Sequence, residues 1–300
     1  MSPTTSQQPN QTEPQMQPAP PYPPQHQNRQ PGIESDMNPR PVFDNPDYKG
    51  SGKLKDKVAI ITGGDSGQGR AIALAFAKEG ADVVVVYLNE HTDAAETQQL
   101  VEQKGRRCIT IAGDIGSETF CQQVVKQTIE HFGKLHILVN NAAEQHVRNG
   151  LETITSEQME TTFRTNFFSI FYLTKAALPQ LKQGASIVNA ASLTAYEGNE
   201  QLMDYSATKG AIVAFTRSLS KSLHSKGIRV NGVVPGTIWT PLIPASFPAE
   251  QVANWGATTP MKRAGQPYEV APAYVYLASD DSSYVSGQFI HVTGGVIMNG

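Results

Sequence analysis

The stretch Val58-Ala-Ile-Ile-Thr-Gly-Gly-Asp-Ser-Gly-Gln-Gly69 decides the fold of this chain. It begins as a short apolar run, which predicts a buried strand, and it ends in a glycine-rich turn before an Ala-rich helix over residues 70–78. Gly63, Gly67 and Gly69 allow a tight backbone turn and a close approach to a pyrophosphate, whose charge the following helix favours. The stretch therefore predicts a strand, a phosphate-binding loop and a helix in succession.

Apolar runs and amphipathic segments alternate through the rest of the chain. The predicted strands cover residues 58–61, 83–86, 108–112, 137–139, 186–189, 228–234 and 288–292, and the predicted helices cover residues 70–78, 92–104, 117–132, 157–178 and 205–226. Continuous apolar strands separated by helices are typical of a parallel sheet that is covered on both faces. We expect one α/β domain over residues 51–300, a doubly wound Rossmann-type sheet of about seven strands.

Residues 1–50 differ in composition from the rest of the chain. They hold 12 of the 20 prolines and few aliphatic side chains, so they bury too little apolar surface to offset the entropy of ordering. We expect a disordered tail over residues 1–25, followed by an arm without regular structure. Ile33, Met37, Val42, Phe43 and Tyr48 are its potential anchors to the domain. The alternative, a proline-rich ligand at residues 18–24, is less favoured because no basic residue flanks it.

Composition excludes several function classes. The formal net charge is −3 and no basic block is present, which argues against a nucleic-acid partner. Cys108 and Cys121 cannot form a disulfide framework, and no Cys/His cluster has metal-ligand spacing, so we expect no metal. Because the N-terminus lacks a signal peptide and no apolar run approaches the ~20 residues that span a bilayer, we expect a cytoplasmic protein without a membrane partner.

Tyr205 and Lys209 are four residues apart, and therefore lie on one face of the predicted helix. A nearby ammonium favours the phenolate and lowers the pKa of a tyrosine. Such a tyrosine can exchange a proton with an alcohol or a carbonyl. Tyr-x-x-x-Lys is a weak signal alone, since it also describes a half-buried Tyr beside a solvated Lys.

Several motifs occur together and in register. They are Thr62-Gly-x-x-x-Gly-x-Gly69, Asn140-Asn-Ala142, Asn166, Ser192, Tyr205-x-x-x-Lys209 and Pro235-Gly236, with thirteen residues from Ser192 to Tyr205. In this combination residues 55–300 resemble the short-chain dehydrogenase/reductase family. The arm sequence, residues 195–199 and residues 238–244 further resemble a bacterial branch with an N-terminal extension that includes general stress proteins.

The resemblance implies an NAD(P)-dependent oxidoreductase that interconverts an alcohol and a carbonyl by hydride transfer. It implies that Tyr205 is the acid/base, that Lys209 lowers its pKa, that Ser192 binds the substrate oxygen and that Asn166 holds a water. The residues implied for the cofactor are Gly63, Asp65, Ser66, Gly67, Gln68, Gly69, Asn89, Asp114, Ile115, Asn141, Ala142, Tyr205, Lys209, Pro235, Gly236, Ile238 and Thr240, with Asp114 and Ile115 at the adenine ring.

The choice between NAD and NADP depends on the end of the second strand. An acid there binds the ribose 2′-hydroxyl and repels a 2′-phosphate, but this chain has Asn89. No Lys or Arg lies between Lys78 and Lys104 to bind a phosphate, although Arg70 could reach. We therefore favour NAD, with use of NADP also open. Gln68 and Ala143 depart from the Ile or Leu and the Gly usual in the family.

Residues 237–262 are expected to close the substrate pocket as a lid with Trp239, Phe247 and Trp255. Glu197, Asn199 and Asp204 favour a small hydroxylated substrate. The resemblance also implies a homotetramer, with the helix after Tyr205 and the C-terminal strand as contacts. Two alternatives stay open: a dehydrogenase similar to glucose 1-dehydrogenases, and a non-catalytic stress protein that binds dinucleotide.

Overall fold

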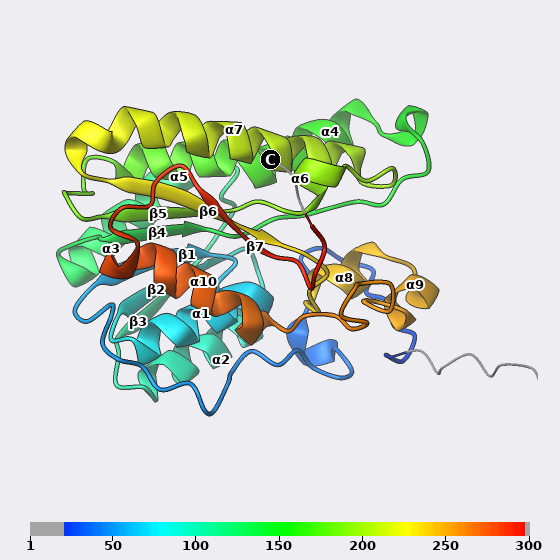
Figure 1. The fold of residues 1–300 in the computed structure, drawn as a ribbon, viewed down its shortest axis with the longest axis horizontal. Helices are drawn as coiled ribbons and strands as arrows, with labels where there is room; N and C mark the ends of the chain where they lie inside the picture. Colours follow the sequence, from blue (N-terminus) through cyan, green and yellow to red (C-terminus); the bar gives the residue numbers. More distant parts are fainter. Residues whose placement is uncertain (1–20, 298–300) are drawn as a thin grey trace, which may run out of the picture.

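One parallel sheet of seven strands forms the centre of the computed structural model, which describes residues 21–297 (Figure 1). The strand order is β3-β2-β1-β4-β5-β6-β7. The strands are β1 (Val58–Thr62), β2 (Asp82–Tyr87), β3 (Cys108–Ala112), β4 (Ile137–Asn140), β5 (Ser186–Ala190), β6 (Arg229–Pro235) and β7 (Phe289–Val292). The predicted doubly wound plan and all seven strands are confirmed.

Helices cover both faces of the sheet (Figure 1). The longer ones are α1 (Gly67–Lys78), α2 (His91–Glu102), α3 (Glu118–Phe132), α4 (Ser156–Phe163), α5 (Ser169–Ala177), α7 (Met203–Leu223) and α10 (Pro267–Ala278). Short helices are α6 (Thr194–Glu197), α8 (Leu242–Ser246) and α9 (Ala249–Ala253). Within residues 21–297, no helix is long and apolar enough to cross a membrane.

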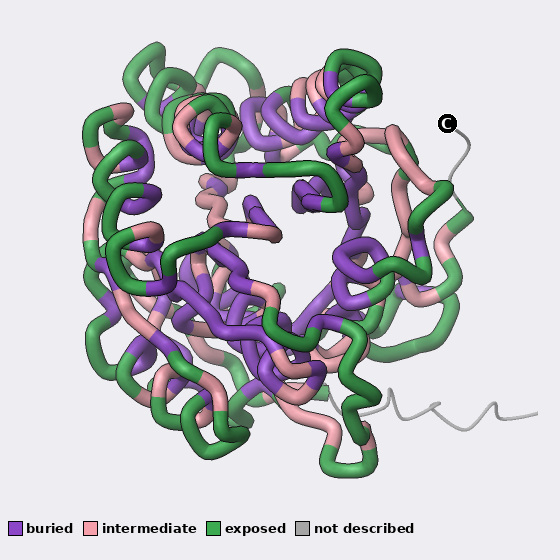
Figure 2. Tube along the Cα trace, turned by 90° about the vertical axis from the view of Figure 1, so that its left-hand side faces the viewer, coloured by how far each residue is buried: buried purple, intermediate pink, exposed green. Residues whose placement is uncertain are grey.

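The two faces of the sheet carry separate apolar cores, because successive side chains of a strand point to opposite faces. Ala59 and Ile61 pack in one core with α1 and α10, while Val58 and Ile60 pack in the other with α3 and α5. Figure 2 shows the result: buried residues follow the strands and inner helix faces, and exposed residues follow the periphery.

The single helix expected over residues 157–178 is interrupted. A π-helical turn, Arg164–Phe168, separates α4 from α5. Such turns add one residue to a helix and are frequent at functional sites, and this one carries the buried Asn166. Hydrophobic periodicity gave no sign of this interruption.

Helix α10 was not predicted, because its two prolines are residues that normally argue against a helix. Pro267 occupies the first turn, where no intrahelical donor is lost, and Gln266 and Glu269 form a capping box before it. Pro272 lies inside the helix. Helix α10 packs directly on α1, and so supports the helix that begins at the glycine-rich loop.

The N-terminal arm, residues 21–48, is an extended segment with one short 3-10 turn, Glu34–Asp36. Its contacts begin at Tyr22, earlier than expected: the Tyr22 ring stacks on Trp239 with centroids 3.9 Å apart, and its N–H donates to the Ala253 carbonyl. Gln27 N–H donates to the Pro244 carbonyl at 2.8 Å. The arm thus lies on the segment that holds α8 and α9. The rest of the expected tail, residues 1–20, lies outside the described residues.

Candidate active site

The glycine-rich loop after β1 adopts a conformation that only glycine accepts easily. Gly63 and Gly67 have positive φ angles of 60° and 50°, in the left-handed region. A Cβ on Gly69 would lie 1.7 Å from the Gly63 carbonyl oxygen, so Gly69 lets α1 approach the loop and does not itself line a cavity. Asn141 anchors the loop, since its Nδ2 donates to the Thr62 carbonyl at 3.0 Å.

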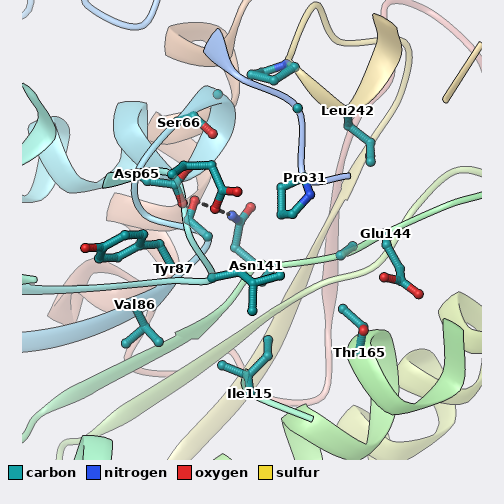
Figure 3. Close-up of a pocket in the computed structure, with 18 of the residues that line it drawn as sticks. Pro31, Asp65, Ser66, Val86, Tyr87, Ile115, Asn141, Glu144, Thr165 and Leu242 are labelled. Carbon is teal, nitrogen blue, oxygen red and sulfur yellow. Dashed lines mark hydrogen bonds between the residues drawn. The ribbon is translucent and has the colours of Figure 1, made fainter. Parts of the chain in front are cut away.

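A first cavity, here named the loop cavity, lies beside this loop at the carboxyl ends of β1, β2 and β4 (Figure 3). Ten residues predicted to hold the cofactor line it: Gly63, Asp65, Ser66, Gly67, Gln68, Asp114, Ile115, Asn141, Ala142 and Thr240. Glu90, next in sequence to the expected Asn89, also lines it, and so do Tyr87, Leu88, Glu144, Thr165 and Leu242, which sequence reasoning missed. Figure 3 shows Pro31 of the arm between Asp65 and Leu242.

Two acids, Asp65 and Glu90, line the β2 end of the loop cavity. Asp65 is buried, and burial raises its pKa to about 7, a shift that the nearby Glu90 increases. Asn89 lies at the rim and accepts a hydrogen bond from Nη2 of Arg29 at 2.6 Å. The structure therefore places Asn89 beside an arm residue, not in the wall of the cavity.

A second cavity, the Tyr205 cavity, adjoins the first through five residues that line both: Gln68, Asn141, Ala143, Thr240 and Leu242. Its wall contains the predicted Ser192, Tyr205, Lys209, Pro235, Gly236 and Ile238. Ser192 follows β5, and Tyr205 and Lys209 lie on one face of α7. A reactant in this cavity would therefore meet a hydroxyl and a phenol beside the loop cavity.

Burial dominates the protonation of this pair. It raises the pKa of Tyr205 to about 12, and a hydrogen bond with Ser192 opposes part of that shift. It lowers the pKa of Lys209 to about 7. The Lys209 ammonium lies 5.4 Å from the Tyr205 ring centroid and donates to the Ala190 carbonyl at 2.8 Å. Burial thus dominates the Tyr205 pKa in this structure, and the expected lowering by Lys209 remains a prediction.

Asn166 lies apart from both cavities and holds the main chain of Glu144. Its Oδ1 accepts from the Glu144 N–H at 2.8 Å, and its Nδ2 donates to the Glu144 carbonyl at 2.9 Å. The π-helical turn sets the position of this amide. Asn166 therefore fixes the strand-end segment that lines both cavities, and its implied water remains a prediction.

Arg70 does not reach the cavity. Its side chain is fully buried, with Nη1 2.6 Å from the Glu34 carboxylate and Nε donating to Thr97 at 3.0 Å. The other oxygen of Glu34 accepts from the N–H of Gly67 at 2.6 Å, at the start of α1. The suggestion that Arg70 could bind a 2′-phosphate was therefore wrong. Its guanidinium forms an ion pair with Glu34, which joins the arm to the glycine-rich loop.

Only some of the residues expected in the lid line the Tyr205 cavity. Ile243, Phe247 and Trp255 line the cavity, whereas Trp239 is fully buried beneath the arm. Of the three polar residues expected near the substrate, Asn199 lines the cavity. Asp204 instead accepts hydrogen bonds from Gln158 and Thr162, and Glu197 is exposed. The polar wall is formed by Gln68, Gln145, Thr194 and Asn199.

The two joined cavities fit an extended dinucleotide. The glycine-rich loop brings backbone close to the cavity, and α1 begins there. Among the described residues the buried Oε1 of Gln68 has no hydrogen-bond partner, at the point where the cavities meet, so it is available to a ligand amide or hydroxyl. Residues 21–297 contain no cluster of three or more acidic, His or Cys side chains suited to a metal ion.

Residues 63–297 match the family model described as enoyl-(acyl carrier protein) reductase. The chain is 66% identical to an oxidoreductase of Bacillus subtilis, YhxC, over 93% of this chain and 97% of that one. It is 59% identical to General stress protein 39 of the same organism, over 91% and 96%, so the expected likeness to general stress proteins is confirmed. It is 52% identical to the glucose and ribitol dehydrogenase of Daucus carota, over 93% and 98%.

Solved structures agree with these relatives. A short-chain dehydrogenase from Burkholderia cenocepacia in complex with NADP has a TM-score of 0.76 at 30% identity, covering 81% of this chain and 98% of that one. A short-chain dehydrogenase from Mycobacterium paratuberculosis bound to NAD has a TM-score of 0.75 at 28% identity, with the same coverage. A nicotinamide dinucleotide is therefore the cofactor class of both neighbours.

Proposed function

The chain belongs to the short-chain dehydrogenase/reductase family of oxidoreductases, and from that premise we propose that it interconverts an alcohol and a carbonyl with Tyr205 as acid/base. The observation that carries the proposal is that Ser192, Tyr205 and Lys209 line the wall of one cavity. The adjoining cavity follows the glycine-rich loop, where a nicotinamide dinucleotide, when bound, would supply the hydride.

The proposed roles follow from the protonation of each group. Tyr205 has a pKa well above neutrality, so its hydroxyl is protonated at pH 7 and can donate to a carbonyl oxygen. Ser192 supplies a second hydrogen bond to the same oxygen, where charge develops. Lys209, with its pKa near 7, can exchange a proton with the solvent side of the site without a large energetic cost. Its charge would also attract the cofactor ribose hydroxyls.

We favour a small polyhydroxylated substrate. Gln68, Gln145, Thr194 and Asn199 offer amide and hydroxyl groups, while Phe247 and Trp255 provide aromatic faces with centroids 4.9 Å apart. A mainly apolar wall that carries a small number of polar groups is typical of small-molecule sites. A carrot relative named for glucose and ribitol supports the sugar alternative within the same reaction class.

NAD is the favoured cofactor in this proposal, with NADP as a second. Glu90 and Asp65 line the β2 end of the loop cavity, with Asn89 at its rim, and acids there suit a ribose hydroxyl. The neighbours with bound NADP and bound NAD support the class of cofactor and leave the preference open to test.

The proposed assembly is a cytoplasmic homotetramer. Phe168 and Phe171 are 37% and 46% exposed, and Phe171 also packs near Phe215 of α7. Exposed aromatic side chains gathered on neighbouring helices suit a protein interface. Two free, buried cysteines, Cys108 and Cys121, suit a reducing compartment.

The decisive experiment combines binding with turnover. Purified protein is titrated with NADH and NADPH while nicotinamide fluorescence is followed, and then assayed with glucose, ribitol, simple alcohols and aldehydes. Binding with turnover of at least one carbonyl or alcohol supports the enzyme. Tight binding without turnover of any of them, in the presence of intact Ser192, Tyr205 and Lys209, would favour the non-catalytic stress protein instead.

A further inference from the structure

The arm carries an arginine to the end of β2, where sequence reasoning found no cation. Nη2 of Arg29 donates to Oδ1 of Asn89 at 2.6 Å and to Oε1 of Glu90 at 2.8 Å, and Nε donates to the Pro31 carbonyl at 2.8 Å. These three hydrogen bonds fix the plane of the guanidinium. The side chain of Arg29 nevertheless remains 42% exposed, so it is open to a ligand.

Its location corresponds to the ribose end of a bound dinucleotide. In doubly wound folds the residue just past the second strand reads the adenosine ribose, and Asn89 lies two residues after β2. Glu90 lines the loop cavity, and so do Pro31 and Gly32, which follow Arg29 in the arm. The guanidinium therefore lies at the rim of the cavity, where a 2′-substituent would emerge.

The charges around this rim indicate that a phosphate can bind there only with the help of Arg29. Glu90 is almost fully buried, with 1% of its side chain exposed, and Asp65 is buried in the same wall. Without a cation the Glu90 carboxylate would disfavour a phosphate. Arg29 pairs with Glu90 through Nη2, and within the described part of the chain its Nη1 makes no hydrogen bond. Two N–H donors are therefore left for phosphate oxygens, in the planar geometry that suits phosphate.

We propose that Arg29 binds the 2′-phosphate of a 2′-phosphorylated adenosine dinucleotide, so that the N-terminal arm determines whether NADP is accepted beside NAD. This inference rests on the proposed function. It assigns cofactor discrimination to a segment that lies outside the sheet and precedes the glycine-rich loop. Arg70, the cation nearest to the loop in sequence, is occupied by Glu34.

The test measures binding, not turnover. Wild type, Arg29→Ala and Arg29→Gln are titrated with NADPH and NADH, and by calorimetry with adenosine 2′,5′-bisphosphate and 5′-AMP. Losing the charge-assisted hydrogen bonds to phosphate should weaken NADPH and the bisphosphate about ten- to a hundredfold. NADH and 5′-AMP should change by less than about threefold. Arg40→Ala is the matched control, because Arg40 is an arm arginine that pairs with Glu34 and Glu96.

The outcomes separate this inference from the function on which it rests. The inference is supported if both Arg29 variants bind NADPH and the bisphosphate more weakly, bind NADH and 5′-AMP as before, and keep the wild-type melting temperature. Equal weakening of all four ligands would overturn it, since Arg29 would then only anchor the arm. A wild type that binds NADH but neither NADPH nor the bisphosphate would also overturn the inference, and it would leave the proposed function standing. A wild type that binds none of the four would overturn both.

Discussion

Burial shifts the pKa values of Tyr205 and Lys209, and so sets the protonation state of both side chains. Both side chains are almost completely buried, so each neutral form is favoured over the charged form. A neutral phenol beside Ser192 is a competent acid for a carbonyl oxygen, and a lysine with a pKa near 7 can both take up and release a proton near neutral pH.

The Tyr205→Phe variant should lose catalysis and keep binding. In the proposed mechanism the phenol contributes the proton, and general acid catalysis is worth about 10²–10⁴ in rate, so kcat should fall by that factor while the dissociation constant for NADH changes little. The matched control is Tyr196→Phe, because Tyr196 has a buried hydroxyl but lines neither cavity. Activity retained in Tyr205→Phe would remove Tyr205 from the mechanism.

Lys209 should make stability depend on pH between about 7 and 10.5. Its folded pKa of about 7 lies below its ordinary value of 10.5. In this window the unfolded chain binds more protons than the folded one, so stability rises with pH. Below pH 7 the folded protein bears the full cost of a buried charge.

Replacing Lys209 by Met removes that cost. In urea unfolding, the stability of Lys209→Met relative to wild type should be highest at pH 6 and should decline towards pH 10. The hydrogen bond to the Ala190 carbonyl is lost at every pH, so it shifts the difference without changing its slope. Lys221→Met, an exposed change on the same helix, should show no such slope. A pH-independent difference for Lys209→Met would mean that the ammonium is better solvated than its burial indicates.

At the scale of elements, the junction of the arm with α1 depends on Glu34. One of its oxygens caps the Gly67 N–H and the other pairs with the fully buried Arg70. Breaking a buried ion pair costs about 3–5 kcal/mol. Because Arg70 keeps Glu96 at 2.8 Å, we expect Glu34→Ala to lower the free energy of unfolding by about 3 kcal/mol, the lower end of that range.

Urea unfolding of two further variants defines this effect. Glu34→Gln should cost less than Glu34→Ala, since its amide oxygen can still accept from Gly67. Glu160→Ala, an exposed change on α4, should stay within about 0.5 kcal/mol of wild type. Equal stability of Glu34→Ala and Glu160→Ala would show that the arm does not support the loop.

Some elements were predictable from sequence and others were not, for physical reasons. Strands such as β3 are short runs of mainly apolar and β-branched residues, so their bounds follow from local pattern alone. Helix α10 contains two prolines that hide its period. The roles of Arg29 and Arg70 depend on partners that only the tertiary fold brings near. The site's motifs could therefore be found by resemblance, whereas the arm's share of the site could not.

At the scale of the whole molecule, the exposed aromatic side chains on the π-helical turn and α5 should hold protomers together. Phe171→Glu combined with Phe168→Glu places charges in that face, and burying an unpaired charge is costly. Light scattering after gel filtration should show a mass below that of wild type. Leu151→Glu, at a side chain 69% exposed outside this face, should leave the mass unchanged. An unchanged mass for the double variant would place the interface elsewhere.

The arm's docking also orders events during protein synthesis. His26 bonds to the Phe247 carbonyl across 221 residues of sequence, so the arm is synthesised well before the segment on which it docks. At about 5–20 residues per second, that delay is roughly 10–50 s. Until then the nascent chain has neither the Trp239 ring for Tyr22 nor the Pro244 carbonyl for Gln27. The arm can therefore dock only after the segment up to Phe247 has been synthesised.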